Sequence, residues 1–234
     1  MRVAIMQPYF LPYVGYFQLI AAADLFIIYD NIKYTKKGWI NRNRMLLNGS
    51  DATFSLPLKN ASDHLHINER ELSPHFDAEK LLNQFKEAYR RAPNLQIVMP
   101  LLETILRYPA PNLFEFLLHS LTQCCQYLGI TTPFKRSSDI AIDHELRSQE
   151  KVLALCRANA ADHYLNAIGG QQLYQRTAFL EQGIELEFIQ SLLVPYRQFD
   201  DEFVPWLSII DVLMFNSPEA LRLAIHTQLE VNPA

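Results

Sequence analysis

The chain has 234 residues, of which 49% are hydrophobic and 20% are charged, and its formal net charge is −4. These values are typical of a soluble globular protein with a substantial core, and they exclude disordered and collagen-like chains. The negative balance excludes a protein that coats DNA, and no apolar run reaches the roughly eighteen residues that a membrane span needs.

The first residues predict alternating strands and helices. An apolar strand over 3–6 ends at Gln7, and a helix is expected over 13–23, after a loop that Pro8 and Pro12 bracket. A second apolar strand follows over 24–30. The order strand, loop, helix, strand is typical of α/β proteins.

The rest of the chain predicts a helical middle and a second α/β unit. Further strands are expected over 53–58, 65–72, 137–142, 162–166 and 184–189. Helices are expected over 76–91, 112–128, 149–159, 171–182, 205–215 and 218–229. The last of these helices has Ser217 as a predicted N-cap ahead of Pro218.

These elements predict an α/β fold with a Rossmann-like, mostly parallel sheet flanked by helices, a helical insertion in mid-chain and a helical carboxyl terminus. A single domain over 1–234 is expected. Its α/β core would span about 1–60 and 135–190, its helical layer about 75–130, and its terminal helices about 205–230.

The segment from Lys33 to Arg44 is the strongest candidate for a binding site. It contains five cations, two aromatic residues and two carboxamides within twelve residues, and no acid. It follows a predicted strand that ends at Asp30, at the sheet edge where open α/β sheets bind ligands. A solvated charge run is the alternative interpretation. The candidate residues are Asp30 at the strand end and, within the segment, Lys36, Lys37, Trp39, Asn41, Arg42, Asn43 and Arg44.

The loop after the first strand is a second candidate. Gln7 ends a buried strand and needs partners for its carboxamide, and Gly15 would allow close approach of a ligand. The position is that of the HxGH loop of nucleotidylyltransferases, but Tyr16 stands where the second histidine would be. Tyr9 and its aromatic neighbours are equally consistent with core packing.

Two further groups of residues lie in the carboxyl half. Asn166, Gly169 and Gly170 join a predicted strand to a predicted helix, which is the geometry of an anion-binding turn and also of an ordinary connection. Ser208 and Asp211 are the polar residues of an otherwise apolar helix. Asp211 needs a partner, and pairing with Arg42 or Arg44 would make it either a structural anchor or a catalytic carboxylate.

The histidines and cysteines predict no metal site and identify no cofactor. His64 and His66 lack a dependable third ligand. The three cysteines, Cys124, Cys125 and Cys156, are odd in number and have no redox or metal spacing, which is typical of a reducing cytoplasm.

Four stretches of the chain closely resemble the WbqC-like family of bacterial proteins. They are the opening 1–20, Trp-Ile-Asn-Arg-Asn-Arg at 39–44, Tyr-Leu-Asn-Ala-Ile-Gly-Gly at 164–170, and Phe-Val-Pro-Trp-Leu-Ser-Ile-Ile-Asp at 203–211. The resemblance covers nearly the whole chain and implies a role in the synthesis of O-antigen or another surface polysaccharide. Where the family has Ser-Pro before the two glycines, this chain has Ala167 and Ile168.

We therefore expect an enzyme that transfers a group onto an activated or amino sugar. Its partner would be a small anionic substrate such as a nucleotide sugar, held by the cations of the 33–44 segment and oriented by Gln7 and the carboxamides. Asp211 and Lys36 are the catalytic candidates. The alternatives are an ATP-dependent ligase or altered nucleotidylyltransferase, an RNA-binding module, and a non-catalytic scaffold.

Overall fold

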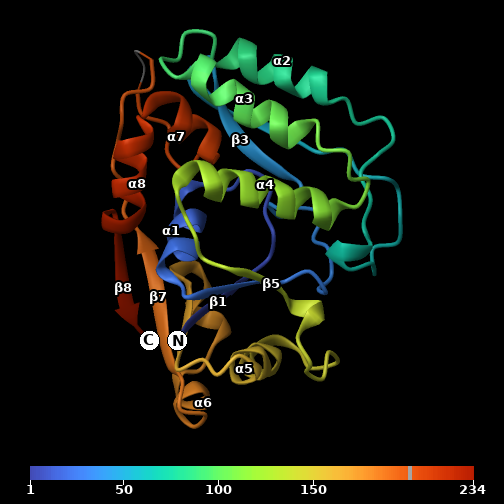
Figure 1. Cartoon of the computed structure of the whole chain (residues 1–234), viewed down its shortest axis with the longest axis vertical. Helices are drawn as coiled ribbons and strands as arrows, with labels where there is room; N and C mark the ends of the chain where they lie inside the picture. The colour runs from blue at the N-terminus through green and yellow to red at the C-terminus, as the bar shows by residue number, and fades with distance from the viewer. Residues whose placement is uncertain (200–201) are drawn as a thin grey trace.

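A computed structural model describes residues 1–199 and 202–234 of the chain (Figure 1). Its main sheet has the strand order β5-β2-β1-β6-β7-β8, in which the first five strands are parallel and β8 is antiparallel to β7. The strands are β1 (Arg2–Met6), β2 (Leu25–Ile28), β5 (Phe134–Arg136), β6 (His163–Ala167), β7 (Glu185–Ser191) and β8 (Leu229–Pro233). The predicted α/β fold with a mostly parallel sheet is confirmed.

The strand order changes direction between β1 and β6. From β1 the chain moves outward to β2 and then β5, whereas β6 and β7 lie on the opposite side of β1. Ligands of open α/β sheets bind outside the carboxyl ends of the strands at such a switch point. The loops that follow β1, β2 and β6 are therefore the positions at which a site is expected.

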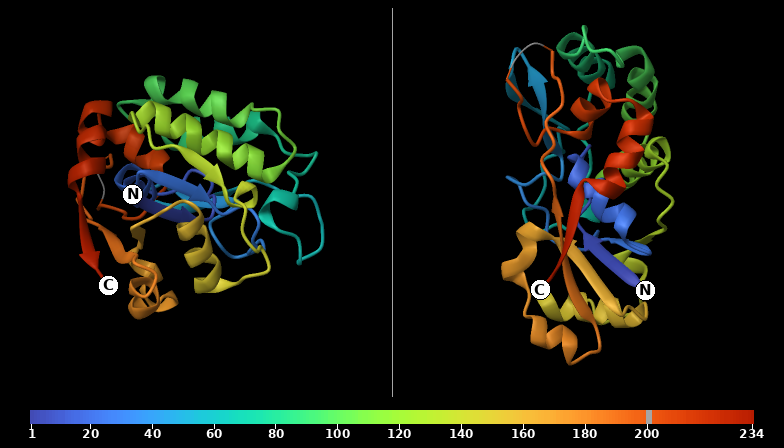
Figure 2. Two further views of the ribbon diagram at one scale, coloured as in Figure 1. Left: turned by 60° about the horizontal axis from the view of Figure 1, so that its bottom comes forward. Right: turned by 90° about the vertical axis from the view of Figure 1, so that its left-hand side faces the viewer.

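Helices cover both faces of the sheet (Figure 2). Alternate residues of β1 point to opposite faces, so Ala4 joins one core and Ile5 the other. The larger core includes side chains of α1 (Val14–Ala22), α4 (Leu113–Leu128) and α8 (Pro218–Thr227). The smaller core lies under α5 (Ser148–Ala158) and α6 (Arg176–Leu180).

The middle of the chain forms the predicted helical insertion. Helix α2 (Ala78–Ala88) packs on α3 (Leu95–Leu106), and α3 packs on α4, above the sheet in Figure 1. The insertion also contacts α7 (Ile209–Phe215) and the hairpin of β3 (Arg42–Leu47) and β4 (Ser50–Ser55). Asn48 and Gly49, at the hairpin turn, have φ angles of 51° and 75°, which is why a glycine suits this turn.

Helix α3 was not expected because Pro100 lies inside it. An interior proline removes a hydrogen bond and usually breaks a helix. Here Leu95, Val98, Leu102 and Ile105 are buried along one face of α3, so tertiary packing outweighs the local cost of the proline.

Several other predicted elements are wrong. The 65–72 segment contains the 3₁₀ helix η1 (Ile67–Glu69), because His66 and Glu69 form a capping box, and is not a strand. The 137–142 segment contains the 3₁₀ helix η2 (Ser137–Asp139), which follows the short strand β5. The predicted helix over 171–182 is divided into the 3₁₀ helix η3 (Ile168–Leu173) and α6, and strand β8 was not predicted.

The carboxyl-terminal helices are confirmed, with a later start for the first, at Ile209. Ser217 caps α8, because its side-chain oxygen accepts a hydrogen bond from the Ala220 amide at 3.2 Å. Among the helices of the described residues, none has both the length and the apolar character that crossing a bilayer requires.

Candidate functional site

The 33–44 segment folds into a turn around Trp39 and then enters β3. The guanidinium carbons of Arg42 and Arg44 lie 5.7 and 5.5 Å from the Trp39 ring centroid. Such distances are favourable for cation–π contacts. The Trp39 side chain is 40% exposed, so its ring is accessible beside the two guanidinium groups. We call Trp39, Arg42 and Arg44, with the backbone turn that carries them, the Trp39 turn.

The two arginines of the Trp39 turn are largely engaged with the protein. Arg42 donates from Nε to the Gly38 carbonyl at 3.0 Å and from Nη2 to the Lys37 carbonyl at 2.5 Å. Arg44 donates to Asp51 at 3.3 Å and to the Trp206 carbonyl at 3.1 Å. These bonds hold the shape of the turn, and neither arginine pairs with Asp211.

The lysines of the segment differ in their partners. Lys36 lies 2.7 Å from Asp63, in a pair in which both side chains are mainly exposed. The hydrogen bond from Lys36 is the main reason why the pKa of Asp63 lies below its ordinary value. Neither Lys33 nor Lys37 forms a salt bridge within residues 1–199 and 202–234, and both are exposed. These two ammonium groups are therefore available to an anion.

The carboxamides of the segment face the protein interior. Asn41 accepts from the Tyr34 hydroxyl at 2.7 Å and donates to the Leu56 carbonyl at 2.8 Å. Asn43 is buried and donates to the Phe10 and Leu11 carbonyls at 3.1 and 2.9 Å. Both side chains stabilise the backbone of neighbouring segments through these hydrogen bonds. The Phe10 amide also contacts the Trp39 and Ile40 carbonyls, at 3.3 and 3.1 Å, so the turn is joined to the loop after β1.

Gln7 lies on that loop, at the carboxyl end of β1. Its carbonyl accepts from the Tyr16 hydroxyl at 2.7 Å. Its side chain is half-buried and makes no hydrogen bond within the part of the chain that the structure describes. Because Met6 pairs with Ile28, Gln7 stands beside Tyr29 at the end of β2. A polar group with unused donors and acceptors thus lies next to the switch point.

Tyr9 and Gly15 take part in packing. The ring centroids of Tyr9 and Tyr16 are 5.5 Å apart, and burial, followed by the neighbouring Tyr13, raises the pKa of Tyr9. A Cβ atom at Gly15 would lie 2.4 Å from the ring of Tyr13. The glycine therefore makes room for an aromatic ring of the protein, and no ligand is needed to explain it.

Asp30 organises the end of β2. Its carboxylate accepts from Ser137 Oγ at 2.7 Å, Ser138 Oγ at 2.6 Å, the Ser138 amide at 2.9 Å and Asn68 Nδ2 at 2.9 Å. Burial raises its pKa, but the hydrogen bonds from the two serines and Asn68 outweigh burial, so the pKa lies below its ordinary value. The ionised form of Asp30 is thus stabilised.

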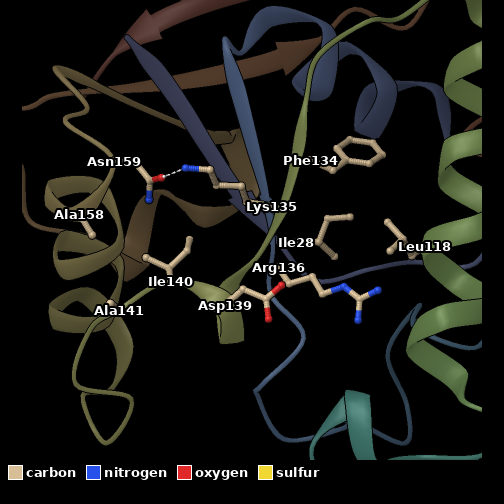
Figure 3. Close-up of a pocket in the computed structure, with 10 residues that line it drawn as sticks. All are labelled: Ile28, Leu118, Phe134, Lys135, Arg136, Asp139, Ile140, Ala141, Ala158 and Asn159. Carbon is tan, nitrogen blue, oxygen red and sulfur yellow. Dashed lines mark hydrogen bonds between the residues drawn. The ribbon is translucent and has the colours of Figure 1, made fainter.

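Asp30 also lines a polar cavity of about 430 Å³. Arg136 lines the same cavity, donates to both carboxylate oxygens of Glu115 at 2.7 and 3.0 Å, and lies 5.1 Å from the Phe114 ring centroid. A second cavity of about 490 Å³ lies beside edge strand β5, where Lys135 donates to Asn159 at 2.8 Å (Figure 3). Polar ligands have room on both sides of Arg136.

Sequence reasoning missed Lys151, which α5 places beside the end of β2. Its side chain is buried, and Nζ lies 3.1 Å from the His144 carbonyl and 5.5 Å from the Tyr29 ring centroid. Burial is the main reason why its pKa lies below the ordinary value of lysine. A lysine at an apolar position of an amphipathic helix was the available signal.

The Asn166–Gly170 turn is not the start of an α-helix. Asn166 is buried, donates to the hydroxyls of Tyr164 and Tyr174 at 2.9 and 3.1 Å, and accepts from the Ala167 amide at 2.7 Å. Gly170 lies against Asn166, whereas Gly169 faces open space and belongs to η3. A long helix dipole that would hold an anion is therefore absent at these glycines.

Asp211 is completely buried and lies in a closed hydrogen-bond network. It accepts from Tyr196 at 2.5 Å, Gln198 at 2.6 Å and Tyr89 at 3.0 Å. The expected pairing with Arg42 or Arg44 is wrong, because these neutral donors satisfy the carboxylate. Burial raises the pKa of Asp211 in spite of the three hydrogen bonds. The geometry favours an anchoring role.

Ser208 is the N-cap of α7 and joins three parts of the chain. Its hydroxyl donates to the Leu11 carbonyl at 2.7 Å, and its amide donates to the Arg44 carbonyl at 2.8 Å. Several residues singled out from the sequence thus differ in role. Gln7, Asp30 and the Trp39 turn lie at loops that follow β1 and β2, and Asn41, Asn43 and Ser208 fix those loops to the rest of the protein. Asp211 bonds instead to Tyr89, Tyr196 and Gln198.

None of the residue groups in 1–199 and 202–234 brings together three or more His, Cys, Asp or Glu side chains in a way that could hold a metal ion. Cys124, Cys125 and Cys156 are buried free thiols. Burial raises the pKa of Cys125 and of Cys156 to about 12, which makes both poor nucleophiles.

Comparison with known proteins agrees with the resemblance in the sequence. The model of the WbqC-like protein family matches residues 7–223. The chain is 31% identical over 230 residues to the uncharacterized protein Rv1507c of Mycobacterium tuberculosis, a match that covers 94% of this chain and 97% of that protein. No solved structure matches the chain significantly. The chain belongs to the WbqC-like protein family.

Proposed function

We propose that the protein is an enzyme of bacterial surface polysaccharide synthesis that transfers a group onto an activated or amino sugar. One observation supports this proposal above the others. The Trp39 turn, which belongs to the same basic segment as Lys33 and Lys37, is hydrogen-bonded to the loop after β1 at the switch point of a parallel sheet. Both lysines are exposed, and neither forms a salt bridge within residues 1–199 and 202–234. Cations at that position suit a phosphate-bearing substrate such as a nucleotide sugar.

The remaining residues have distinct roles in the proposal. Gln7 orients the substrate with its unused carboxamide, and the exposed Trp39 ring offers a face to a base or a sugar. Lys36 can leave Asp63 for the substrate at little cost, because exposed ion pairs contribute little to stability. Positioning and electrostatic stabilisation then carry the transfer, and Asp211 has a structural role outside the binding segment.

Thermal shifts against a panel of nucleotide sugars test the proposal. At a hundredfold excess over the dissociation constant, a ligand of the native state adds about 2.7 kcal/mol, which corresponds to a rise in Tm of about 5 to 10 °C for a chain of this size. We expect one nucleotide sugar to give this shift, and Lys33→Ala with Lys37→Ala to remove it.

Lys59→Ala is the matched control. Lys59 is exposed and pairs with Glu71 outside the segment, and its removal lowers the net charge by one, as each of the single variants Lys33→Ala and Lys37→Ala does. It is therefore compared with those single variants. Arg42→Ala is a less specific variant, because it also deletes the bonds to the Gly38 and Lys37 carbonyls that shape the turn. An unchanged shift in the double lysine variant would exclude the segment from the binding site.

An ATP-dependent ligase or altered nucleotidylyltransferase is the second candidate. The connection from β1 to α1 has the expected strand-loop-helix geometry, and α1 has no side-chain cap at its start and no acid in its first turn. Uncapped amides at a helix start suit a phosphate. A thermal shift with ATP alone, together with release of pyrophosphate during turnover, would favour this candidate over the transferase.

A further inference from the structure

An apolar cavity of about 140 Å³ lies between the chain that follows β7 and the helices α1 and α8. It is separate from the polar cavity beside Asp30, with which it shares no lining residue. Its lining includes Tyr13, Tyr196, Phe203, Trp206, Leu207 and Leu221. The proposed function uses none of these residues.

Aromatic rings line part of this cavity. The Tyr13 and Trp206 rings make an edge contact with centroids 6.0 Å apart, and Tyr196 and Phe203 make another at 5.1 Å. Trp206, Leu193 and Val194 are 46%, 48% and 45% exposed. Three large apolar side chains at one opening present a surface that an apolar ligand would cover.

The backbone holds Trp206 in this position. Its φ angle is 59°, in the left-handed region that a residue with a large side chain rarely adopts. The Trp206 carbonyl accepts from Arg44 at 3.1 Å, and the Ser208 amide donates to the Arg44 carbonyl at 2.8 Å. A strained conformation that neighbouring bonds fix in place is typical of ligand-binding positions.

Three polar side chains in the wall already have partners within the protein. Ser191 donates to Gln18 at 2.6 Å, Asn216 donates to the Val212 carbonyl at 2.9 Å, and Tyr196 donates to Asp211. The Tyr13 hydroxyl makes no hydrogen bond with the described residues, and the same holds for the Trp206 indole N–H and the Gln228 carboxamide. Burial raises the pKa of Tyr13, so its hydroxyl remains a donor at neutral pH.

We propose that this cavity binds the acyl chain of a small molecule, with the chain inside and the carbonyl oxygen accepting from the Tyr13 hydroxyl. The volume of about 140 Å³ is close to that of a dry engineered cavity that holds benzene, so about six carbons fit. This inference does not depend on the proposed sugar transfer, because it concerns different residues.

Tryptophan fluorescence can measure binding directly, because the chain has two tryptophans. In a Trp39→Phe variant, Trp206 is the sole tryptophan and stands at the entrance of the cavity. Butanoate and hexanoate are the probes. We expect a saturable change in emission, with a dissociation constant that falls about fourfold for each added methylene up to six carbons.

Two further substitutions in this background locate the site. Ala224→Leu places a larger side chain at a buried lining position and should remove the response. His226→Leu, on the same helix but outside the cavity, is its matched control and should leave the affinity unchanged. Tyr13→Phe should weaken hexanoate binding by about two- to tenfold, the expected loss for one hydrogen bond.

A response without chain-length dependence, or one that Ala224→Leu leaves intact, would overturn the proposal. Circular dichroism melting shows whether Ala224→Leu is folded. If it is not, Ala220→Leu replaces it, because Ala220 also lines the cavity but is exposed and tolerates a larger side chain. Absence of any saturable change up to the solubility limit of hexanoate would also count against an acyl site.

Discussion

Asp211 is a carboxylate on an apolar helix, and its hydrogen-bond partners and burial indicate a structural role. Tyr196, Gln198 and Tyr89 surround it with hydrogen-bond donors, and none of its surface is exposed. The donors come from separate elements, since Tyr89 follows α2 and the other two precede α7. Asp211 therefore connects the helical insertion with the carboxyl-terminal part of the chain.

Removing this carboxylate should cost stability. We expect Asp211→Ala to lower the free energy of unfolding by about 1 to 3 kcal/mol or more, because buried donors lose their acceptor. Urea denaturation measures the loss, and Tyr196→Phe, which removes one donor, is expected to cost less. A catalytic Asp211 would instead give an Asp211→Asn variant with unchanged stability and no turnover.

Asp30 should contribute a pH-dependent part of the stability. Its pKa is lower in the folded state than the ordinary value near 4, so its contribution is present above that value and is lost as the pH falls through the lowered pKa. Asp30→Asn does not titrate. We therefore expect the difference in unfolding free energy between the wild type and Asp30→Asn to shrink between pH 7 and about pH 3. A difference that is constant with pH would contradict this assignment.

At the scale of elements, the site depends on how the loops after β1 and β2 are joined. The Phe10 amide contacts the Trp39 turn, Asn43 holds the Phe10 and Leu11 carbonyls, and Ser208 holds Leu11 from α7. Each contact lies between residues distant in sequence. The position of the basic turn is therefore a property of β3, α7 and the first loop together.

Strand β8 protects one edge of the main sheet. It pairs with β7 over Leu229 to Pro233, and Gln18 holds the preceding Gln228 carbonyl at 2.8 Å. Deleting residues 229–234 would expose the hydrogen-bonding groups of β7. We expect concentration-dependent association of the shortened chain, detectable by light scattering, because unpaired edges add further strands. Deleting Ala234 alone, which removes a single hydrogen bond to the Leu186 carbonyl of β7, is the control. A monodisperse truncated protein would contradict the prediction that β8 protects this edge.

The whole molecule combines a net charge of −4 with a local group of cations. For a small phosphate ligand, we expect the logarithm of affinity to fall with the logarithm of salt concentration at a slope of about −1 to −2, since few ionic contacts form. A single-stranded RNA that covers the basic segment and its surroundings would give a much steeper slope. Titrations at several salt concentrations with a nucleotide sugar and with an RNA oligonucleotide distinguish the two kinds of partner.

The local pattern was sufficient for elements whose apolar residues recur with a clear strand or helix period. The first strand, the first helix, the helices at 78–88 and 113–128, and Ser217 as a cap are all as expected, because each depends on neighbours in the sequence. Prediction of secondary structure failed where contacts between residues distant in sequence stabilise the element. Helix α3 contains Pro100, and β8 exists because β7 lies beside it.

The sequence by itself determined the family, the α/β class and the position of the basic segment, because these depend on composition, periodicity and local motifs. Only the tertiary structure decided which polar residues face inward. Asn43, Ser208 and Asp211 make their hydrogen bonds to residues far along the chain, and Lys151 reaches the end of β2 from α5. The physical reason is that burial and hydrogen-bond partners arise from packing between elements, which no local pattern specifies.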